Sequence, residues 1–459
     1  MTLLKQEPGF YKGVLRMMIP MIIQSFVSQS MAFADTFMVG LLGETQLAAI
    51  TAATTPFFIV MLACFGLQSG ASIMTSQYHG KGNTHVISRI LGISWMTALS
   101  MTSLIALVAN LIPMQLMKIL TNNPELHTLG SEYIRIVGFS YIFFSFSSMY
   151  TGVQRSLGNP KLGAYIFTVS GTISIFLKWV LIFGNLGVPA MGIRGAAVAT
   201  LISRMLEVVA VLVYMTRSRY LKVEYKLIFR PGKEISRDFL KLAMPVSLNE
   251  LLWSIAMSLF SIIMGHLPNS TAILSAYAIC GNIEKLTSVA IMATGHASAI
   301  TTGTEIGKGN LDTVYGKAVA LNFIAFIVGS IAGLLILLVR NFVAANFLFP
   351  MMGLGAEAQS VAMFMLGVLI FIQPLRALNM ANIVGVLRGG GDILYAFISD
   401  VIPIWVLCIP AAAILGLVFK FGVVPVYLCM IANEILKVIM TLPRLHSKKW
   451  IHNITRELA

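Results

Sequence analysis

The chain has 459 residues, of which 57% are hydrophobic and only 11% are charged. Soluble globular domains carry about 25% charged residues, so this composition excludes an ordinary water-soluble enzyme and indicates a protein that is solvated largely by lipid. One spanning helix needs about 20 apolar residues, which leaves room for roughly a dozen spans and no large domain outside the membrane.

Long apolar stretches separated by short polar ones predict an all-α integral membrane protein with twelve transmembrane helices. Pro20 and Pro245 lie inside long stretches and are expected to kink them. The four cysteines sit in apolar runs without paired or metal-like spacing, so we interpret them as small core residues. The expected spans are 13–40, 47–75, 90–112, 128–153, 162–184, 190–216, 238–265, 270–303, 314–340, 358–387, 392–416 and 421–443.

Basic residues predict the orientation, because lysine and arginine near span ends are retained in the cytoplasm. Twenty-two of the 32 lysines and arginines fall on the side of the two termini, and five fall on the opposite side. We therefore expect a multi-pass protein of the cell (inner) membrane with both termini cytoplasmic. The first apolar run lacks a small-residue cleavage site, so no removable signal is expected. The net charge of +14 then has a topological origin, and no nucleic-acid partner is predicted.

Internal similarity divides the chain into two halves. GKGN occurs at 80–83 and again at 307–310, and GVQRSLGN at 152–159 aligns with GVLRGGGD at 385–392. Each half contains six spans, so both insert in the same orientation and are expected to be related by a pseudo-two-fold axis along the membrane normal. The predicted organisation is an N-terminal six-helix lobe (1–216), a cytoplasmic linker (217–237), a C-terminal six-helix lobe (238–445) and a cytoplasmic tail (446–459).

Asp35 and Lys178 are the first candidate site residues, because an ionisable group inside a span is costly and requires a reason. At 1.5 Å rise per residue, Asp35 in the first span and Lys178 in the fifth both reach the outer half of the membrane. We expect a buried pair that exchanges a proton as its hydration changes. The alternative is a static ion pair that only holds the lobe together.

Glu250 and Glu284 are the second pair of candidates. Both lie near the middle of their spans by the same helix rise, and Asn249, Asn282 and His296 are expected to complete a polar patch around them. In the repeat alignment Asp35 matches Phe260 and Glu250 matches Ser25, so neither acid belongs to the shared scaffold.

Other charges within the spans are interpreted as structural. Arg204 with Glu207, and Glu434 with Lys437, are spaced i to i+3 and are expected to neutralise each other on one helix face. Asp400 is expected to balance Arg376 or Arg388. No role in transport is predicted for these charges.

Motifs for nucleotide hydrolysis, metal catalysis and nucleophilic catalysis are absent from the sequence, so we predict that the protein is not an enzyme and needs no cofactor. Two parallel six-helix lobes are typical of a carrier, and if such a carrier transports uphill, it must use an ion gradient. An enzyme or a purely structural membrane scaffold is the least favoured class.

Several short motifs recur in a fixed order along the chain: ADTFMVG in the first span, the two GKGN motifs, QRSLGNPK after the fourth span, GAAVAT opening the sixth and LRGGGD after the tenth. In these motifs and their order the sequence resembles the multidrug and toxic compound extrusion (MATE) transporters. The resemblance implies two six-helix lobes that export cationic amphipathic compounds in exchange for entering H⁺ or Na⁺. It places the family's first-span aspartate at Asp35 and, loosely, its seventh-span acid at Glu250.

One departure from the family pattern bears on the coupling ion. Many members read N-x-x-L-D in the fifth span, whereas this chain has Ser174 and Lys178 at those positions. A Na⁺ site there would lose a carboxylate and gain a repelling cation, so the expected coupling is by protons through Asp35 or by cations through the second lobe around Glu250. H⁺ is favoured over Na⁺.

We therefore predict a cation-coupled antiporter that exports cationic drugs or xenobiotics across the cell membrane. Its expected partners are small cationic substrates and the lipid bilayer, and it is expected to act as a monomer. The alternative is a flippase for lipid-linked oligosaccharide or anionic lipid, for which Lys178, Arg204 and Arg376 leave some room. Six acids against five bases within the spans favour cationic cargo.

Overall fold

The computed structural model describes residues 5–218, 220–352 and 354–457. Helices make up nearly all of this part of the chain, and it contains no strand. Packing divides the chain into two compact units. The N-terminal unit contains residues 23–75 and 83–247, and the C-terminal unit contains residues up to Ile22, 76–82 and from Leu248 onward. The prediction of an all-α protein is confirmed.

The number of spanning helices comes close to the expected twelve. Among the described residues, ten helices are long and apolar enough to cross a membrane. The helices α6 (Pro124–Val137) and α7 (Ser140–Ser156), bent by 47° relative to each other, form an eleventh if they are counted as one span. The 38-residue α12 (Ser270–Gly307), which carries Glu284 and His296, is a further helix of spanning length.

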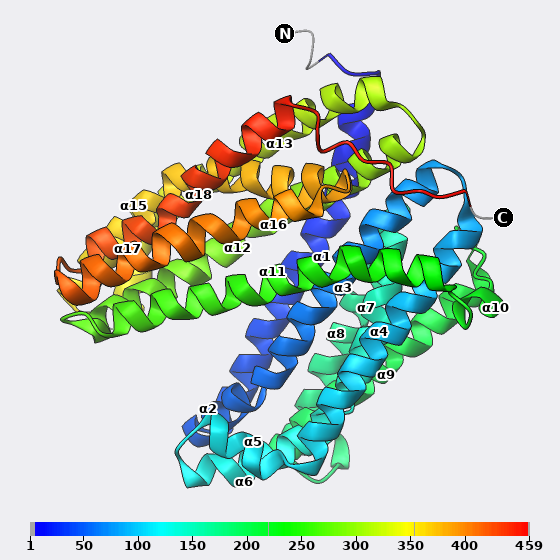
Figure 1. The fold of residues 1–459 in the computed structure, drawn as a ribbon. Coiled ribbons are helices and arrows are strands. Elements are labelled where there is room, and N and C mark those ends of the chain that lie inside the picture. Colours follow the sequence, from blue (N-terminus) through cyan, green and yellow to red (C-terminus); the bar gives the residue numbers. More distant parts are fainter. Residues whose placement is uncertain (1–4, 219, 353, 458–459) are drawn as a thin grey trace. The chain divides into compact units, whose positions relative to one another are not determined.

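In the N-terminal unit, α4 packs against α7, and α8 packs against α9 (Figure 1). Polar caps fix where its helices begin: the side chain of Asn123 accepts a hydrogen bond from the backbone N–H of Glu125, and Pro124 occupies the first turn. Its other elements are α2 (Glu44–Ala53), α4 (Thr84–Leu111), α5 (Pro113–Leu120), α8 (Pro160–Phe183), the 3₁₀ turn η2 (Asn185–Gly187), α9 (Gly192–Arg217), α10 (Tyr225–Ile228) and parts of α1 (Phe10–Gly40), α3 (Thr55–Gly80) and α11 (Lys233–Gly265).

Small residues allow α3 and α11 to approach closely within the N-terminal unit. A Cβ atom added to Gly66 would lie 2.4 Å from the Cα of Ser247, and one added to Gly70 would lie 2.7 Å from the Cα of Ala243. The spacing of four residues on both helices is the small-xxx-small pattern of packed membrane helices. The first part of α11 therefore packs with the N-terminal unit. The lobe boundaries at 216 and 238 stay predictions.

In the C-terminal unit, α12, α13 and α15 pack against one another and α18 packs against α15 (Figure 1). Its main apolar core includes Phe260 and Met264 of α11, both fully buried. Of the four cysteines, Cys280 and Cys408 are buried in this unit and Cys429 is partly buried, while Cys64 is buried in the N-terminal unit. Three of the four are thus buried, as expected for core residues. The remaining elements are α13 (Leu311–Leu338), η3 (Val339–Leu348), α14 (Phe349–Met351), α15 (Ala356–Asn379), η4 (Met380–Leu387), α16 (Ile393–Ile402), η5 (Pro403–Cys408), α17 (Ile409–Ala413), η6 (Ile414–Val418) and α18 (Val423–His446).

The two GKGN motifs bring the ends of α3 and α12 together within the C-terminal unit. A Cβ atom on Gly80 would lie 2.1 Å from the carbonyl oxygen of Thr304, and one on Gly307 would lie 1.9 Å from that of Gln77. The second glycines, Gly82 and Gly309, adopt φ of +78° and +81° in the turns that follow. The repeated motif is therefore explained by close backbone approach and by its turns.

The C-terminal tail packs onto the C-terminal unit. Trp450 is fully buried, and its indole N–H donates a hydrogen bond to the carbonyl oxygen of Leu445 over 3.0 Å. The side chain of Gln77 then holds the tail, because its Nε2 donates to the carbonyl oxygen of His452 (3.1 Å) and its Oε1 accepts from the N–H of Ile454 (2.9 Å).

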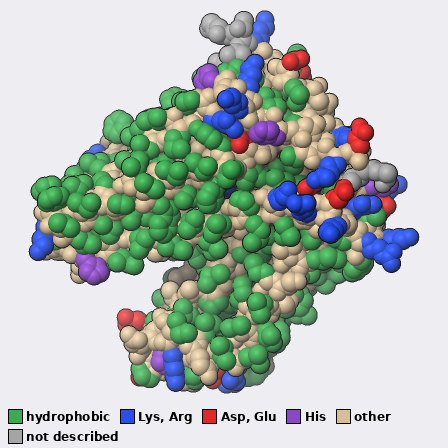
Figure 2. Space-filling model, viewed as in Figure 1, with side chains coloured by type: hydrophobic (Ala, Val, Ile, Leu, Met, Phe, Trp, Pro, Cys, Tyr) green, Lys and Arg blue, Asp and Glu red, His purple; other side chains and the backbone are tan. Residues whose placement is uncertain are grey.

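The surface of the helices is apolar where lipid would contact it. Phe33 and Phe371 are 76% and 78% exposed, and Figure 2 shows hydrophobic side chains over most of the face in view. Lysine and arginine in that view gather toward helix ends, among them the region of α10, rather than over helix middles. This distribution is that of a membrane protein.

Candidate functional site: buried ion pairs in both units

Asp35 and Lys178 form the predicted pair in the N-terminal unit. Asp35 lies on α1 and Lys178 on α8, and the Lys178 Nζ is 2.7 Å from the Asp35 Oδ2. The lysine side chain is only 6% exposed, whereas the aspartate side chain is 39% exposed. The second aspartate oxygen, Oδ1, is buried and has no hydrogen-bond partner among the described residues. One oxygen of this carboxylate therefore remains able to accept a proton or a hydrogen bond.

A second ion pair lies beside the first. The guanidinium of Arg204 contacts both carboxylate oxygens of Glu207, at 2.7 and 2.9 Å, as the i to i+3 spacing predicted. Ser170 donates a further hydrogen bond to Glu207 over 2.7 Å. Arg204 also lies over the ring of Phe144, 5.0 Å from its centroid, and is close enough to Lys178 to repel it electrostatically. These two acids and two bases balance one another.

Glu250 on α11 pairs with an arginine of the C-terminal unit. The Arg388 guanidinium, directly after η4, donates two hydrogen bonds to the Glu250 Oε1 over 3.0 and 3.1 Å. Arg388 is 3% exposed and Glu250 is 16% exposed. Arg388 was expected to balance Asp400, and its contact with Glu250 was not predicted. The repeat gave a signal for this contact, because Arg155 occupies the equivalent position in the first half and also donates to a side chain of its own unit, the partly buried Gln68.

Asp400 on α16 and Lys437 on α18 form the next pair. The lysine Nζ lies 2.6 Å from the Asp400 Oδ1, and the other oxygen, Oδ2, accepts a 2.6 Å hydrogen bond from the side chain of Asn249. The direct partner of Lys437 therefore lies on another helix, while Lys437 and Glu434 still attract each other, as their i to i+3 spacing predicted. Asp400 has Lys437 as its direct partner rather than Arg376 or Arg388, although Arg388 still attracts it at longer range.

Glu284 and Glu434 share one arginine. Arg376 on α15 contacts the carboxylate of Glu284 on α12, and its Nε lies 3.4 Å from the Glu434 Oε1. Asn379 donates a 2.8 Å hydrogen bond to the other oxygen of Glu434. Glu284 and Glu250 thus pair with different arginines, and the expected patch forms only in part: Asn249 binds Asp400, while Asn282 is exposed.

These contacts join into one set of charges, which we call the C-terminal network. Lys437 interacts electrostatically with Glu434 as well as Asp400, and Asp400 in turn interacts with Glu250. Among the described residues the network has four acids and three bases, so when all are ionised it carries one surplus negative charge. Its members are Glu250, Glu284, Asp400, Glu434, Arg376, Arg388 and Lys437.

Comparison with known proteins identifies the family. The family model described as MatE matches residues 20–180 and 245–414, which is more than half of the chain. The chain belongs to the MATE family. This assignment confirms the resemblance seen in the sequence and accounts for the two similar halves, since the model matches each half once.

Relatives of this MATE protein carry multidrug-resistance names. The chain is 24% identical over 439 residues to the probable multidrug resistance protein YoeA of Bacillus subtilis, with 92% of the chain and 90% of the relative covered. It is 24% identical over 417 residues to the probable multidrug resistance protein NorM of Agrobacterium fabrum, with 90% and 88% covered. A solved outward-facing structure of a multidrug resistance MATE family transporter shares the fold, with a TM-score of 0.86 at 21% identity and coverage of 97% and 98%.

Proposed function

We propose that this MATE protein is an H⁺-coupled antiporter that exports cationic, amphipathic drugs across the cell membrane. The names of its relatives support the drug-export part of the proposal. The distribution of lysine and arginine supports an orientation with both termini in the cytoplasm. The protein would act as a monomer within the bilayer.

The observation that carries the proposal is the surplus carboxylate of the C-terminal network. A net charge kept inside a membrane protein is costly unless something neutralises it. Binding one proton or one monovalent organic cation would bring the network to neutrality, but binding both would leave it positive. The two ligands would therefore compete, and competition between an entering proton and a leaving cation is what an exchanger requires.

The surroundings of the acids favour H⁺ over Na⁺. A hard cation needs several oxygen ligands gathered around one point. In the C-terminal network the acids alternate with arginine and lysine, so that Arg388 faces Glu250 and Lys437 faces Asp400. The positions at which carboxylate oxygens would converge on a metal ion are thus occupied by N–H donors. A proton needs only one oxygen and is compatible with this arrangement.

Asp35 and Lys178 would form a second exchange point under this proposal. The pair is neutral, but Asp35 is 39% exposed, and one of its oxygens has no partner among the described residues. A cationic substrate that approaches Asp35 would compete with Lys178 for it. The alternative, a static pair that only stabilises the N-terminal unit, makes a different prediction, because neutralising both residues together would then leave transport intact.

Proteoliposomes test the proposal directly. The purified chain is reconstituted with ethidium as cargo, and a pH gradient and a sodium gradient are imposed in separate experiments. We expect the pH gradient alone to drive ethidium movement, and Glu250→Gln to abolish that movement. Glu132→Gln is the matched control, because Glu132 also pairs with an arginine, Arg194 at 3.0 Å, but is exposed and outside the network.

Two outcomes would contradict the proposal. Movement driven by sodium and not by the pH gradient would replace H⁺ with Na⁺ as the coupling ion. Failure of either gradient to move ethidium, together with transfer of a lipid-linked anionic precursor across the bilayer, would favour a flippase. The surplus negative charge of the C-terminal network does not favour that alternative.

A further inference from the structure

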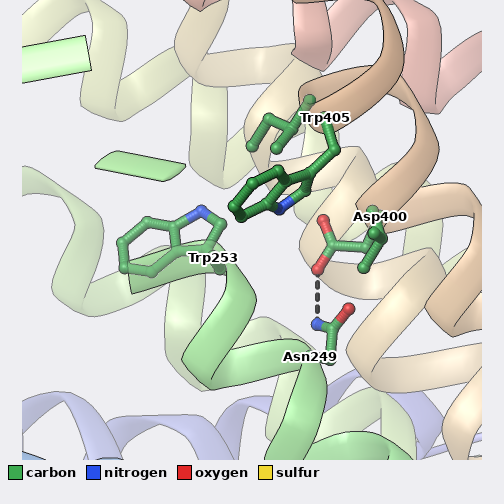
Figure 3. A pocket seen from close by; sticks show the side chains of 6 residues that line it. Asn249, Trp253, Asp400 and Trp405 are labelled. Atoms are coloured by element: carbon green, nitrogen blue, oxygen red, sulfur yellow. Dashed lines mark hydrogen bonds between the residues drawn. The ribbon is translucent and has the colours of Figure 1, made fainter. Parts of the chain in front are cut away.

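A narrow pocket lies between α11 and the α16–η5 segment of the C-terminal unit (Figure 3). About 150 Å³ of space, part of it open to the surroundings, lies between these side chains, and as they stand it is too narrow to hold a water molecule. A ligand would therefore enter only if a lining side chain moved, and then with one end only, since whole drug-sized ligands occupy pockets of roughly 300–1,000 Å³. The lining residues are Asn249, Trp253, Asp400, Val401, Ile404 and Trp405.

The geometry of the two segments creates this combination of side chains. Asn249 and Trp253 are four residues apart on α11 and therefore share one face of that helix. Asp400 and Trp405 come from the facing segment, and Figure 3 shows both indole rings and the carboxylate gathered around the same space. Asn249 is 2% exposed at the base of the pocket, whereas Trp253 is 42% exposed at its rim. Admitting a ligand would require the exposed indole of Trp253 to turn aside.

Two buried polar atoms at this pocket have no partner among the described residues. They are the Oδ1 of Asn249, an acceptor, and the indole Nε1 of Trp405, a donor. A buried polar group without a partner costs free energy, so each atom calls for a ligand or water to satisfy it. The unpartnered amide oxygen of Asn249 belongs to a side chain that is almost entirely buried, which makes it independent evidence for a site.

The lining selects for an organic cation. Indole rings attract cations through the negative potential of their faces, and two indoles with a carboxylate are a typical setting for alkylammonium groups. Asp400 supplies that carboxylate, although Lys437 and Asn249 already contact it. An incoming ammonium group would share Asp400 with Lys437, and the surplus negative charge of the C-terminal network would keep the sum of charges near zero.

We propose that this pocket binds the ammonium end of the exported cation, with Trp253 and Trp405 contacting the group and Asp400 attracting it. The inference rests on the proposed function and makes it more specific, because it names a cargo subsite and a substrate class. The Asn249 oxygen accepts a hydrogen bond when the ammonium group carries a proton. Because Asp400 belongs to the network that would take up the coupling proton, cargo and proton affect each other through shared charge rather than by direct contact.

Binding of radiolabelled phenyltrimethylammonium to the purified full chain in lipid nanodiscs tests this subsite. Trp253→Leu and Trp405→Leu should each weaken binding about 2- to 30-fold, the range expected for the loss of one cation–π contact. Trp253→Phe and Trp405→Phe should retain most of the affinity, because phenylalanine keeps an aromatic face. Trp179→Leu is the matched control, since Trp179 is 44% exposed, like Trp253, but lies on α8 in the N-terminal unit.

Asp400→Asn should also weaken binding, and the tryptophan variants keep the test decisive if this variant does not fold. Unchanged affinity in both Trp→Leu variants, or no binding by the unmodified chain, would overturn the subsite. A different result would show that the proposed function fails while the subsite exists. In that case ammonium binding would depend on both tryptophans, but the pH gradient would move no cargo in proteoliposomes.

Discussion

The Asp35–Lys178 pair yields a stability prediction whose size follows from the exposure of each partner. Removing one partner of a buried ion pair costs about 3–5 kcal/mol, because the other charge is left uncompensated. Asp35→Asn leaves the ammonium of Lys178 without its partner. Because that side chain is only 6% exposed, we expect a loss of about 3–5 kcal/mol in the free energy of unfolding. Lys178→Met leaves Asp35 without its partner, but this carboxylate is 39% exposed, so the loss should be only about 1–2 kcal/mol.

The double variant completes the thermodynamic cycle. With both charges removed, no buried charge is left without a partner. We therefore expect Asp35→Asn and Lys178→Met made together to lower the free energy of unfolding less than Asp35→Asn alone. SDS-induced unfolding of the purified chain in mixed micelles measures all three free energies. The surface pair Arg194–Glu132 is the control, and breaking it should leave the free energy of unfolding nearly unchanged.

Two results would refute this reasoning. If Lys178→Met destabilises the chain more than Asp35→Asn, then the exposure of the two side chains does not control the cost. If the two single costs simply add in the double variant, then Asp35 and Lys178 do not interact energetically. Transport by the double variant further separates the two functions considered for the pair, since a static pair predicts that ethidium efflux survives and an exchange point predicts that it is lost.

Two further predictions concern the ends of the C-terminal unit. Trp450→Ala should lower the free energy of unfolding by about 3–5 kcal/mol, because the ring is fully buried. SDS-induced unfolding measures this loss, and Trp179→Ala at an exposed site is the control. Glu305, past the predicted span 270–303, has a pKa of about 2: burial alone would raise it, but hydrogen bonds from Lys317, Asn310 and Lys308 outweigh burial and lower it. Because the folded-state pKa lies below the ordinary value, its contribution to stability is full above about pH 4.5 and is lost as the pH falls toward 2. Glu305→Gln should remove that part of the pH dependence, and an unchanged unfolding profile between about pH 5 and 2 would contradict the assignment.

Helix depth could be predicted from the sequence, and contacts that depend on depth alone were predicted well. Asp35 and Lys178 lie on spans that run in opposite directions, and the rise of 1.5 Å per residue placed them at one level before any rotation was known. Arg204 and Glu207 were equally accessible to sequence reasoning, because the i to i+3 rule applies within a single helix.

Contacts that depend on helix rotation and on partner choice were not predictable in the same way. Glu434 and Lys437 have the same i to i+3 spacing as Arg204 and Glu207, yet Lys437 binds Asp400 on a neighbouring helix. The intrahelical pair is worth only a few tenths of a kcal/mol, so a buried carboxylate on a facing helix easily outcompetes it. A single sequence gives no information on which face of α18 points toward α16.

Comparison of equivalent positions in the two halves of the structure distinguishes residues of the shared scaffold from residues specific to one half. Arg155 and Arg388 occupy equivalent positions, and both donate hydrogen bonds to side chains inside their units, so the shared arginine belongs to the scaffold. Its partners differ, because Gln68 is neutral and Glu250 is an acid. That difference gives the C-terminal network its surplus negative charge, while the ion pairs of the N-terminal unit remain balanced.

The same contrast applies at the position equivalent to Asp35. In the second half this position is Phe260, which is fully buried in the apolar core of the C-terminal unit. Each half therefore places an acid where the other half has a residue that cannot ionise: Asp35 against Phe260, and Glu250 against Ser25. A residue that only stabilises the fold has no reason to differ between halves with the same packing. Acids that break the repeat are for this reason the best candidates for binding the transported charges.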